Sequence, residues 1–216
     1  MDLTNIRVLI WDFDGTLYKP NADLFRAVRE SEYQTIINHT DWSRTKVIEE
    51  FDKLYKKTIQ SATEVTGVLS GITTAQAAGE MEGFFDRRQF IGRDEQLLAL
   101  FQTLKAYRHF ILANGIIAHH KETLVLLGLP WETFEDDVTS EIVGETKPSL
   151  KGFQYILGKT GLPADVHLMI GDREAVDLVP AKQLGMKTCL VWADTPSTVA
   201  DITLPTVYDV AQALGH

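Results

Sequence analysis

The sequence predicts an α/β fold in which a parallel sheet lies between two layers of helices, with a helical block inserted after the first strand. Three observations predict it. The chain contains short apolar runs without turn residues, which are typical of strands buried on both faces. From residue 92 onward these runs alternate with segments of helical periodicity, the pattern of strand–helix–strand units. Between residues 18 and 91 the apolar residues recur at helical spacing.

Composition narrows the class of protein further. The 216 residues are 44% hydrophobic and 24% charged, as in an ordinary soluble globular protein of one domain with or without an insertion. A net charge of −9 argues against nucleic acid and against an anionic membrane surface as partners. No apolar run approaches the ~20 residues of a membrane span, and the N-terminus lacks the pattern of a signal peptide. The single cysteine, Cys189, excludes an intrachain disulfide, so we expect a cytoplasmic protein with a buried, inert thiol.

The first strand is expected over Val8–Trp11, followed directly by the segment Asp12-Phe13-Asp14-Gly15-Thr16-Leu17. Alternation along a strand would send Asp12 and Asp14 to the same side, and Gly15 allows a sharp turn. Two carboxylates this close need a neutralising partner, and Mg²⁺ is commonly held by one or two carboxylates with phosphate and water. The alternative is that the two aspartates only cap a turn.

The inserted block begins after Pro20, which ends the strand. We expect its helices to begin near Asn21, near Asp41 or Ser43, at the capping box Ser61–Glu64, and near Thr74, with the last ending near Arg87. Trp42, Phe84 and Phe85 are expected to pack among these helices, with the alternative that one of them lines a substrate pocket. Arg87 and Arg88 are expected to form a solvated helix end, with the alternative that they reach a substrate.

The remainder alternates between strands and helices. Strands are expected over residues 109–113, 134–139, 166–170 and 187–192, with a short sixth over 202–204. Helices are expected to begin at Asp94, near Ile116, at Ser149, near Glu174 and at Val207. Acidic residues at 135–137 weaken the third strand. The alternation predicts a three-layer, Rossmann-like parallel sheet.

Polar residues follow three of these strands. They are Asp12 with Asp14, the run Ala113-Asn114-Gly115, and Asp172 after Gly171. Because the carboxyl ends of parallel strands meet at one edge of the sheet, these groups should converge there, where open α/β sheets bind their ligands.

Two further residues are expected to reach this edge from helices. Pro148 suits the first turn of a helix, so Lys147 should lie near that helix's N-terminus. Asp177 lies five residues after Asp172, and a helix beginning near Glu174 would turn its side chain back toward a metal ion.

In this order and spacing, the motifs resemble those of the haloacid dehalogenase (HAD) superfamily of hydrolases, and the resemblance covers the whole chain. Residues 12–17 look like its first motif, Lys147-Pro148 like its lysine motif, and Gly171-Asp172 with Asp177 like its acidic motif. The helical block resembles the family's helical (C1-type) cap. The resemblance therefore implies a core of residues 1–17 and 92–216, with a cap of residues 18–91.

The resemblance also implies a Mg²⁺-dependent phosphatase acting on a small phosphorylated metabolite, as a monomer or homodimer. Asp12 would be the nucleophile that forms an aspartyl-phosphate, Asp14 the general acid and base, and Lys147 the group that neutralises charge. Mg²⁺ would be held by Asp12, the backbone carbonyl of Asp14 and Asp172. Asp177 would orient this set from outside it.

One position departs from the family pattern. The second strand of the family ends in Ser or Thr, whose hydroxyl binds the phosphoryl oxygens, whereas this chain has Ala113 followed by Asn114-Gly115. Three explanations are open: Asn114 or a backbone N–H replaces the hydroxyl, the enzyme is slow, or the position has been altered from the natural residue. The loop 113–115 remains the expected phosphate-binding segment.

Other functions stay open as alternatives. A phosphomutase would use the same residues but shield its aspartyl-phosphate from water, and a retired enzyme would keep only a binding or regulatory role. The dehalogenase branch is disfavoured because it has no use for Asp14. His119 and His120 lie on a predicted helix with no carboxylate at metal-binding spacing, so we expect both at the surface.

Overall fold

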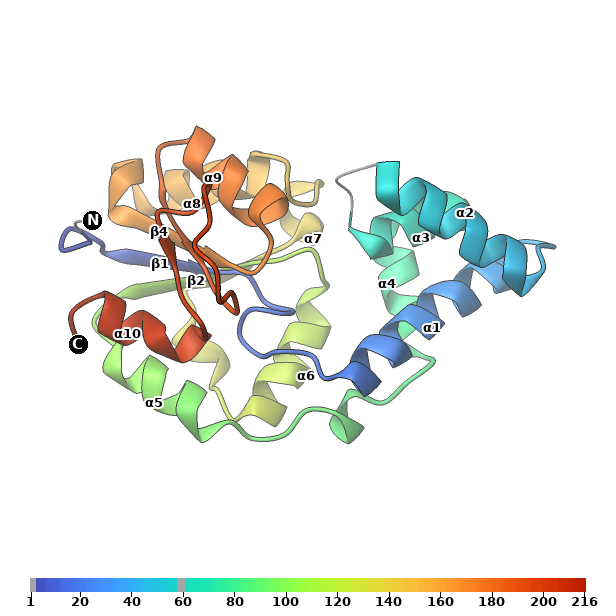
Figure 1. The fold of residues 1–216 in the computed structure, drawn as a ribbon, viewed down its shortest axis with the longest axis horizontal. Helices are drawn as coiled ribbons and strands as arrows, with labels where there is room; N and C mark the ends of the chain where they lie inside the picture. The colour runs from blue at the N-terminus through green and yellow to red at the C-terminus, as the bar shows by residue number, and fades with distance from the viewer. Residues whose placement is uncertain (1–2, 58–60) are drawn as a thin grey trace. The chain divides into compact units, whose positions relative to one another are not determined.

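The computed structural model describes residues 3–57 and 61–216; residues 1, 2 and 58–60, which the expected domain ranges include, lie outside the described residues. The chain divides into two compact units, one of residues 1–19 with 92–216 and one of residues 20–91. In this division Tyr18 and Lys19 belong to the larger unit. The ribbon of both units is drawn in Figure 1.

The larger unit is built on a parallel sheet. Within the described residues the sheet has six strands in the order β3-β2-β1-β4-β5-β6. The strands are β1 (Val8–Trp11), β2 (Arg108–Leu112), β3 (Asp136–Val138), β4 (His167–Gly171), β5 (Lys187–Leu190) and β6 (Ile202–Thr203). The first strand of the chain thus lies in the centre, between β2 and β4. This sheet confirms the predicted α/β fold.

Helices cover both faces of the sheet, giving three layers (Figure 1). One face carries α8 (Lys151–Thr160) and α9 (Val179–Gln183), and the other carries α5 (Glu95–Thr103), α6 (Ile117–Leu127) and α10 (Val210–Ala213). On the first face, Val8 and Ile10 of β1 share a core cluster with Phe153 of α8. On the second, the ring of Trp11 lies 4.9 Å from that of Phe101 in α5. Both faces of β1 are therefore buried, as its unbroken apolar sequence requires.

Some boundaries differ from the predicted ones. The helix expected at Ser149 begins at Lys151, and Pro148 lies in a turn before it, after a cis Lys147–Pro148 peptide bond. Pro148 is therefore not in the first turn of the helix as expected, and Lys147 lies in the turn that precedes α8, near the N-terminus of that helix. A short helix, α7 (Ser140–Val143), was not expected, because four residues are too few for a periodic pattern. The segment Glu174–Leu178 is helical as expected, but it forms a π turn (η4) that leads into α9.

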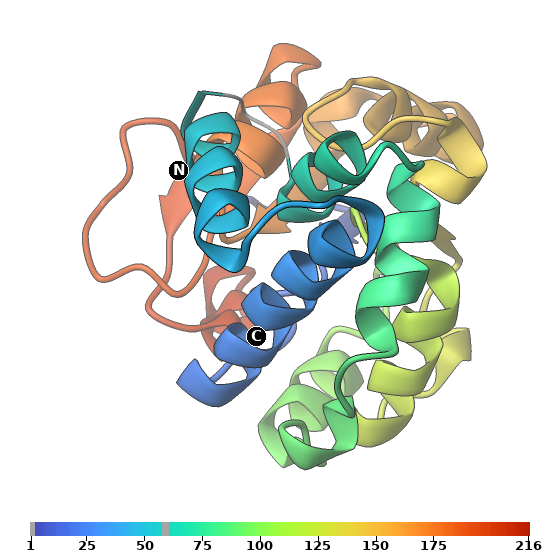
Figure 2. The same ribbon diagram turned by 90° about the vertical axis from the view of Figure 1, so that its right-hand side faces the viewer.

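The smaller unit consists of α1 (Ala22–His39), α2 (Arg44–Lys57), α3 (Ala62–Ser70) and α4 (Thr74–Glu82), coloured blue to green in Figure 2. Residues 20–57 and 61–91 contain no strand, in agreement with the helical periodicity. Asn21 and Ser61 cap α1 and α3, each accepting a hydrogen bond from a backbone N–H in the first turn. Over the parts of the chain that are described, no helix is both long and apolar enough to cross a bilayer.

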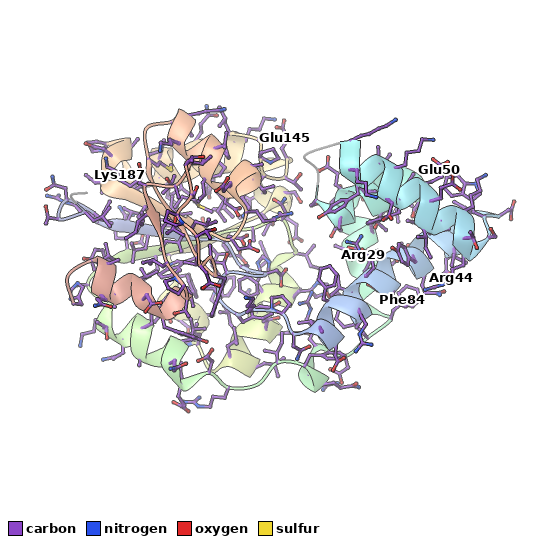
Figure 3. All side chains as sticks on the ribbon, viewed as in Figure 1. Arg29, Arg44, Glu50, Phe84, Glu145 and Lys187 are labelled. Atoms are coloured by element: carbon purple, nitrogen blue, oxygen red, sulfur yellow. The ribbon has the colours of Figure 1, made fainter. Side chains whose placement is uncertain are left out.

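The core of this unit is small and combines aliphatic and aromatic side chains. Ile36, Val47, Phe51 and Val65 are fully buried, and Trp42 packs partly against them as expected. Phe84, labelled in Figure 3, is instead 43% exposed, so it does not pack in this core, and the alternative that it lines a substrate pocket stays a prediction. The expected solvated end is half right: Arg88 is exposed, but the half-buried Arg87 pairs with Glu82.

Candidate functional site

A buried ammonium group joins two buried carboxylates at the carboxyl edge of the sheet. Lys147 Nζ donates to Asp12 Oδ1 at 2.5 Å and to Asp177 Oδ1 at 2.6 Å. Lys147 is 3% exposed and Asp177 is fully buried. Burial by itself lowers the pKa of Lys147, but the charges and hydrogen bonds of the two aspartates outweigh it, so that pKa is raised. Lys147 is therefore a fixed positive charge beside Asp12.

The turn after β1 holds the second oxygen of Asp12. Thr16 Oγ1 donates to Asp12 Oδ2 at 2.9 Å, and the Thr16 carbonyl accepts a hydrogen bond from Trp192 Nε1 at 3.0 Å. Gly15 makes the turn with φ of +89°, where a Cβ atom would also lie 2.6 Å from Asp172 Oδ2. Glycine is thus required at position 15 for its conformation and for space.

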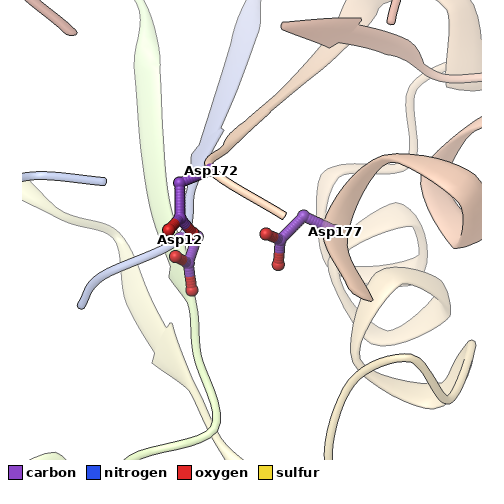
Figure 4. Close-up of side chains that lie close together, drawn as sticks. All are labelled: Asp12, Asp172 and Asp177. Atoms are coloured by element: carbon purple, nitrogen blue, oxygen red, sulfur yellow. The ribbon is translucent and has the colours of Figure 1, made fainter. Parts of the chain in front are cut away.

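Three carboxylates face one another at this edge. One oxygen from each of Asp12, Asp172 and Asp177 lies within 4.8 Å of the others (Figure 4). Asp172 Oδ1 is buried and has no hydrogen-bond partner among the described residues. Burial, together with the charges of Asp12 and Asp177, raises the pKa of Asp172 to about 7. The three carboxylates carry more negative charge than the single ammonium group of Lys147 neutralises, and a hard divalent cation prefers oxygen ligands of this kind. These residues therefore fit Mg²⁺.

Asp177 reaches this group because of its local backbone. It lies in the π turn η4, and π turns within helices are frequent at functional sites. The backbone N–H of Arg173 donates to Asp177 Oδ2 at 3.1 Å. A Cβ atom at Gly171 would lie 2.6 Å from the Asp177 side chain, so the close approach depends on that glycine. Burial raises the pKa of Asp177, and the nearby Lys147 offsets part of this effect.

Asp14 occupies a different environment from Asp12. Its side chain is exposed, and the buried Tyr18 donates its hydroxyl hydrogen to Asp14 Oδ1. The cluster of facing carboxylates does not include Asp14. The two aspartates of the first motif are therefore separated into one fixed and buried carboxylate and one that is open to solvent.

The loop after β2 is tied to Lys147. Asn114 Nδ2 donates to the Lys147 carbonyl at 2.9 Å, and the Lys147 N–H donates to Asn114 Oδ1 at 2.7 Å. Both ends of the Asn114 amide thus hold the Lys147 backbone. The backbone N–H groups of Asn114 and Gly115 donate to no residue of the described chain. Ala113 is 4% exposed. The free hydrogen-bond donors of this loop are therefore on its backbone.

The structure brings together most of the residues expected at the site and adds some that the sequence did not reveal. Asp12, Lys147, Asp172 and Asp177 make one cluster with the loop 113–115 held against it. No sequence pattern points to Tyr18 or Trp192, because their contacts depend on how the turn folds. His120, expected at the surface, is instead buried beside Asp137. The acidic residues in the third strand were the one available signal for that pair.

Comparison with known proteins identifies the family. Residues 6–185 match the protein family described as haloacid dehalogenase-like hydrolase. The chain belongs to the haloacid dehalogenase-like hydrolase family. Its sequence is 40% identical over 79 residues to a glyceraldehyde 3-phosphate phosphatase of Methanocaldococcus jannaschii. These aligned residues make up 36% of this chain and 34% of that protein. It is 33% identical over 87 residues to the enzyme of the same name from Methanothermobacter thermautotrophicus, covering 40% and 38%. The matches thus span little more than a third of these relatives' length.

Solved structures of the HAD fold resemble the whole chain. A HAD phosphatase from Thermococcus onnurineus has a TM-score of 0.69 at 19% identity, covering 97% of this chain and 98% of that one. A HAD hydrolase from Bacillus subtilis, bound to magnesium, has a TM-score of 0.61 at 20% identity, with 98% and 99% covered. A 2-haloacid dehalogenase from Pseudomonas syringae has the same TM-score at 16% identity, with 97% and 98% covered. Since a phosphatase and a dehalogenase both share it, the fold alone does not select the reaction.

Proposed function

We propose that the chain is a Mg²⁺-dependent phosphatase that hydrolyses a small phosphorylated metabolite through an aspartyl-phosphate, with residues 20–91 as its cap. The observation that carries this proposal is the group in which Lys147 holds Asp12 beside Asp172 and Asp177. The names of the two curated relatives make glyceraldehyde 3-phosphate the first substrate to test. The exposed Asp14 supplies the general acid and base of a phosphatase reaction, for which the dehalogenase branch has no use.

In the first half of the reaction, an oxygen of Asp12 attacks phosphorus and the bond to the substrate oxygen breaks. Asp14 gives its proton to that leaving oxygen, while Tyr18 holds the Asp14 carboxyl in place. Lys147 and the backbone N–H groups of Asn114 and Gly115 stabilise the negative charge on the transferring oxygens. A bound Mg²⁺, held by Asp12, the Asp14 carbonyl and Asp172, would add further positive charge to this site.

In the second half, water attacks the phosphorus of the aspartyl-phosphate. Asp14, now deprotonated, takes a proton from that water. Inorganic phosphate leaves, and Asp12 returns to its carboxylate form between Lys147 and Thr16. The exposed position of Asp14 suits a group that must exchange protons with both the substrate and water.

The test is phosphate release from a panel of phosphorylated metabolites that includes glyceraldehyde 3-phosphate and hexose phosphates, with and without Mg²⁺. A phosphatase releases inorganic phosphate, whereas a phosphomutase converts one sugar phosphate to its isomer with little release. A retired enzyme would bind a substrate without either reaction. Absence of phosphate release across the panel, with the Asp12→Asn variant as background, would contradict the proposal.

Removing the cation should change stability in a way that depends on pH. Because the folded protein raises the pKa of Asp172 to about 7, folding favours its protonated form, and stability falls as pH rises from about 4 toward 7. A cation that binds the Asp172 carboxylate stabilises its charged form and so offsets this loss of stability. Mg²⁺ should therefore raise the melting temperature of EDTA-treated protein more at pH 8 than at pH 5. Differential scanning fluorimetry checks this, with Asp172→Asn as the variant that should lose most of the pH-dependent gain. An equal gain at both pH values would argue against this site.

Ala113→Ser should raise kcat/KM by roughly tenfold, the lower end of what a hydrogen bond to a charged group supplies. The new hydroxyl lies on the phosphate-binding loop, next to the free N–H groups of Asn114 and Gly115. Steady-state kinetics of both proteins decide it, and an unchanged kcat/KM would mean that the backbone donors already fill this role.

Asn114→Ala is the informative companion to that variant. Since the Asn114 amide holds the Lys147 backbone, its loss should lower kcat/KM by the same factor with Ala113 or with the introduced serine. A greater loss with Ala113 would restore Asn114 as the substitute for the hydroxyl.

A further inference from the structure

His120 and Asp137 form a buried pair that the reaction described above does not use. His120 lies on α6 and Asp137 on β3, and both are 1% exposed. His120 Nδ1 and Asp137 Oδ2 are 2.7 Å apart. The other polar atom of each side chain, His120 Nε2 and Asp137 Oδ1, is buried without a hydrogen-bond partner among the described residues. A pair in this state carries a cost, since buried polar groups are normally hydrogen-bonded.

The imidazole contacts both segments that make up the catalytic edge. Its ring stacks on Phe13, with centroids 4.2 Å apart and planes inclined by 28°. Phe13 is the residue between Asp12 and Asp14, and it is buried. On another side, a Cβ atom at Gly115 would lie 2.5 Å from His120 Nε2, so the ring edge is directly against the backbone of the phosphate-binding loop. His120 thus touches the segment with the nucleophile and the segment with the free N–H donors.

Asp137 fixes the orientation of this ring. A buried carboxylate requires a donor, and Nδ1–H of His120 is that donor for Oδ2. With Nδ1 turned toward Asp137, Nε2 must face Gly115. The ring therefore has one orientation, held by Asp137 at one edge and by Phe13 on its face. An aliphatic side chain would fill similar space without such a fixed edge.

We propose that His120 and Asp137 are a positioning pair for the phosphoryl-transfer site. The pair sets the spacing between Phe13 and Gly115, and with it the distance from the Asp12 carboxylate to the N–H donors of the loop. The proposal rests on the proposed phosphatase function. Neither residue touches the reacting atoms, so their effect on the reaction is exerted through Phe13 and Gly115.

His120→Asn separates this role from a purely structural one. The asparagine amide is able to donate to Asp137 from about the place of Nδ1, so the buried carboxylate keeps its partner and the protein should fold, with a melting temperature lowered by the space that the ring leaves. The ring on Phe13 and the edge against Gly115 are lost. We expect kcat to fall about 10- to 100-fold, as small displacements of reacting groups do, with a smaller change in KM. His119→Asn, the same substitution at the neighbouring position of α6, is the matched control and should leave kcat unchanged.

Gly115→Ala provides a second, independent measurement. In the unaltered chain the added methyl group meets His120 Nε2 and should displace the loop, lowering kcat. In the His120→Asn background the shorter side chain makes room for it. The combined loss in kcat should therefore be smaller than the product of the two single losses, which is the sign of a direct interaction between the two positions.

The outcomes separate this proposal from the proposed function. If the unaltered protein releases phosphate while His120→Asn keeps full kcat, or the two losses multiply, the positioning role is overturned. If the unaltered protein releases no phosphate, the function fails, and binding of inorganic phosphate, measured by calorimetry in the presence of Mg²⁺, decides the positioning role. Weaker phosphate binding in His120→Asn than in His119→Asn supports it, and equal binding overturns it. If His120→Asn does not fold, Asp137→Asn serves as the background, because its amide oxygen still accepts from His120 Nδ1. Gly115→Ala should then lower kcat by the same factor in this background as in the unaltered chain. A smaller loss of kcat in this background would count against the contact between His120 and Gly115.

Discussion

Asp12→Asn should leave a folded protein in which phosphate release is slower by about 10⁴-fold or more, the scale of loss when a catalytic nucleophile is removed. The amide has the shape of the carboxylate but is a very poor nucleophile toward phosphorus. Lys147 Nζ keeps its hydrogen bond to Asp177, so the buried ammonium is not left alone. The substitution also removes one of the negative charges beside Asp172. The melting temperature should therefore stay the same or rise.

Two measurements make this expectation decisive. Steady-state phosphate release gives the loss in kcat, and thermal unfolding shows that the variant is folded. Asp165→Asn applies the same chemical change to an exposed aspartate of the same unit, and it should alter neither. Turnover above about 1% of the original rate, in protein shown by mass spectrometry to be free of deamidation, would remove Asp12 from the nucleophile's role.

Lys147→Met should both destabilise the protein and abolish most of its activity. Methionine is similar in length but carries no charge, so Asp12 and Asp177 would remain buried without their counter-ion. Removing one partner of a buried ion pair costs about 3–5 kcal/mol. The loss of a positive group beside the transferring oxygens should lower kcat by about 10²- to 10³-fold, as for other electrostatic stabilisers.

Urea unfolding of the metal-free protein measures the first effect and phosphate release the second. Adding Asp177→Asn to Lys147→Met should recover part of the stability, because one uncompensated carboxylate is gone, but it should recover no activity. A loss of less than about 1 kcal/mol for Lys147→Met, the range of a solvent-exposed pair, would show that the pairing of this lysine with the two carboxylates contributes little to stability.

The fold was predictable from sequence because its signals are local. The apolar run of β1 and the caps at Asn21 and Asp94 depend on neighbouring residues alone. The site was predictable as far as its residues follow strands, since topology then brings Asp12 and Asp172 to one edge. Lys147 was expected near the N-terminus of a helix and lies in the turn before α8, but this helix begins after Pro148 and not with it.

The contacts between side chains were less predictable. The bond between His120 and Asp137 joins residues 17 positions apart on different elements, and no spacing rule connects them. The two hydrogen bonds of Asn114 depend on the backbone of Lys147, 33 residues later. Such contacts are set by tertiary packing, and sequence periodicity carries no information about them. An acidic residue within a buried strand is the one local hint, because it requires a buried partner.

The central place of β1 has a consequence for how the chain is made. Val8 pairs with Arg108 on one side and with His167 on the other. At about 5–20 residues per second on the ribosome, roughly 5–20 s pass between the synthesis of β1 and that of its first partner, β2. The second partner, β4, follows later. The helices of residues 20–91 are synthesised before β2, and their contacts are local. The turn that carries Asp12 is thus synthesised before both strands that hold β1 in place. Until β4 emerges, one edge of an apolar strand stays unpaired, so chaperone binding and aggregation of nascent chains should concentrate in this interval.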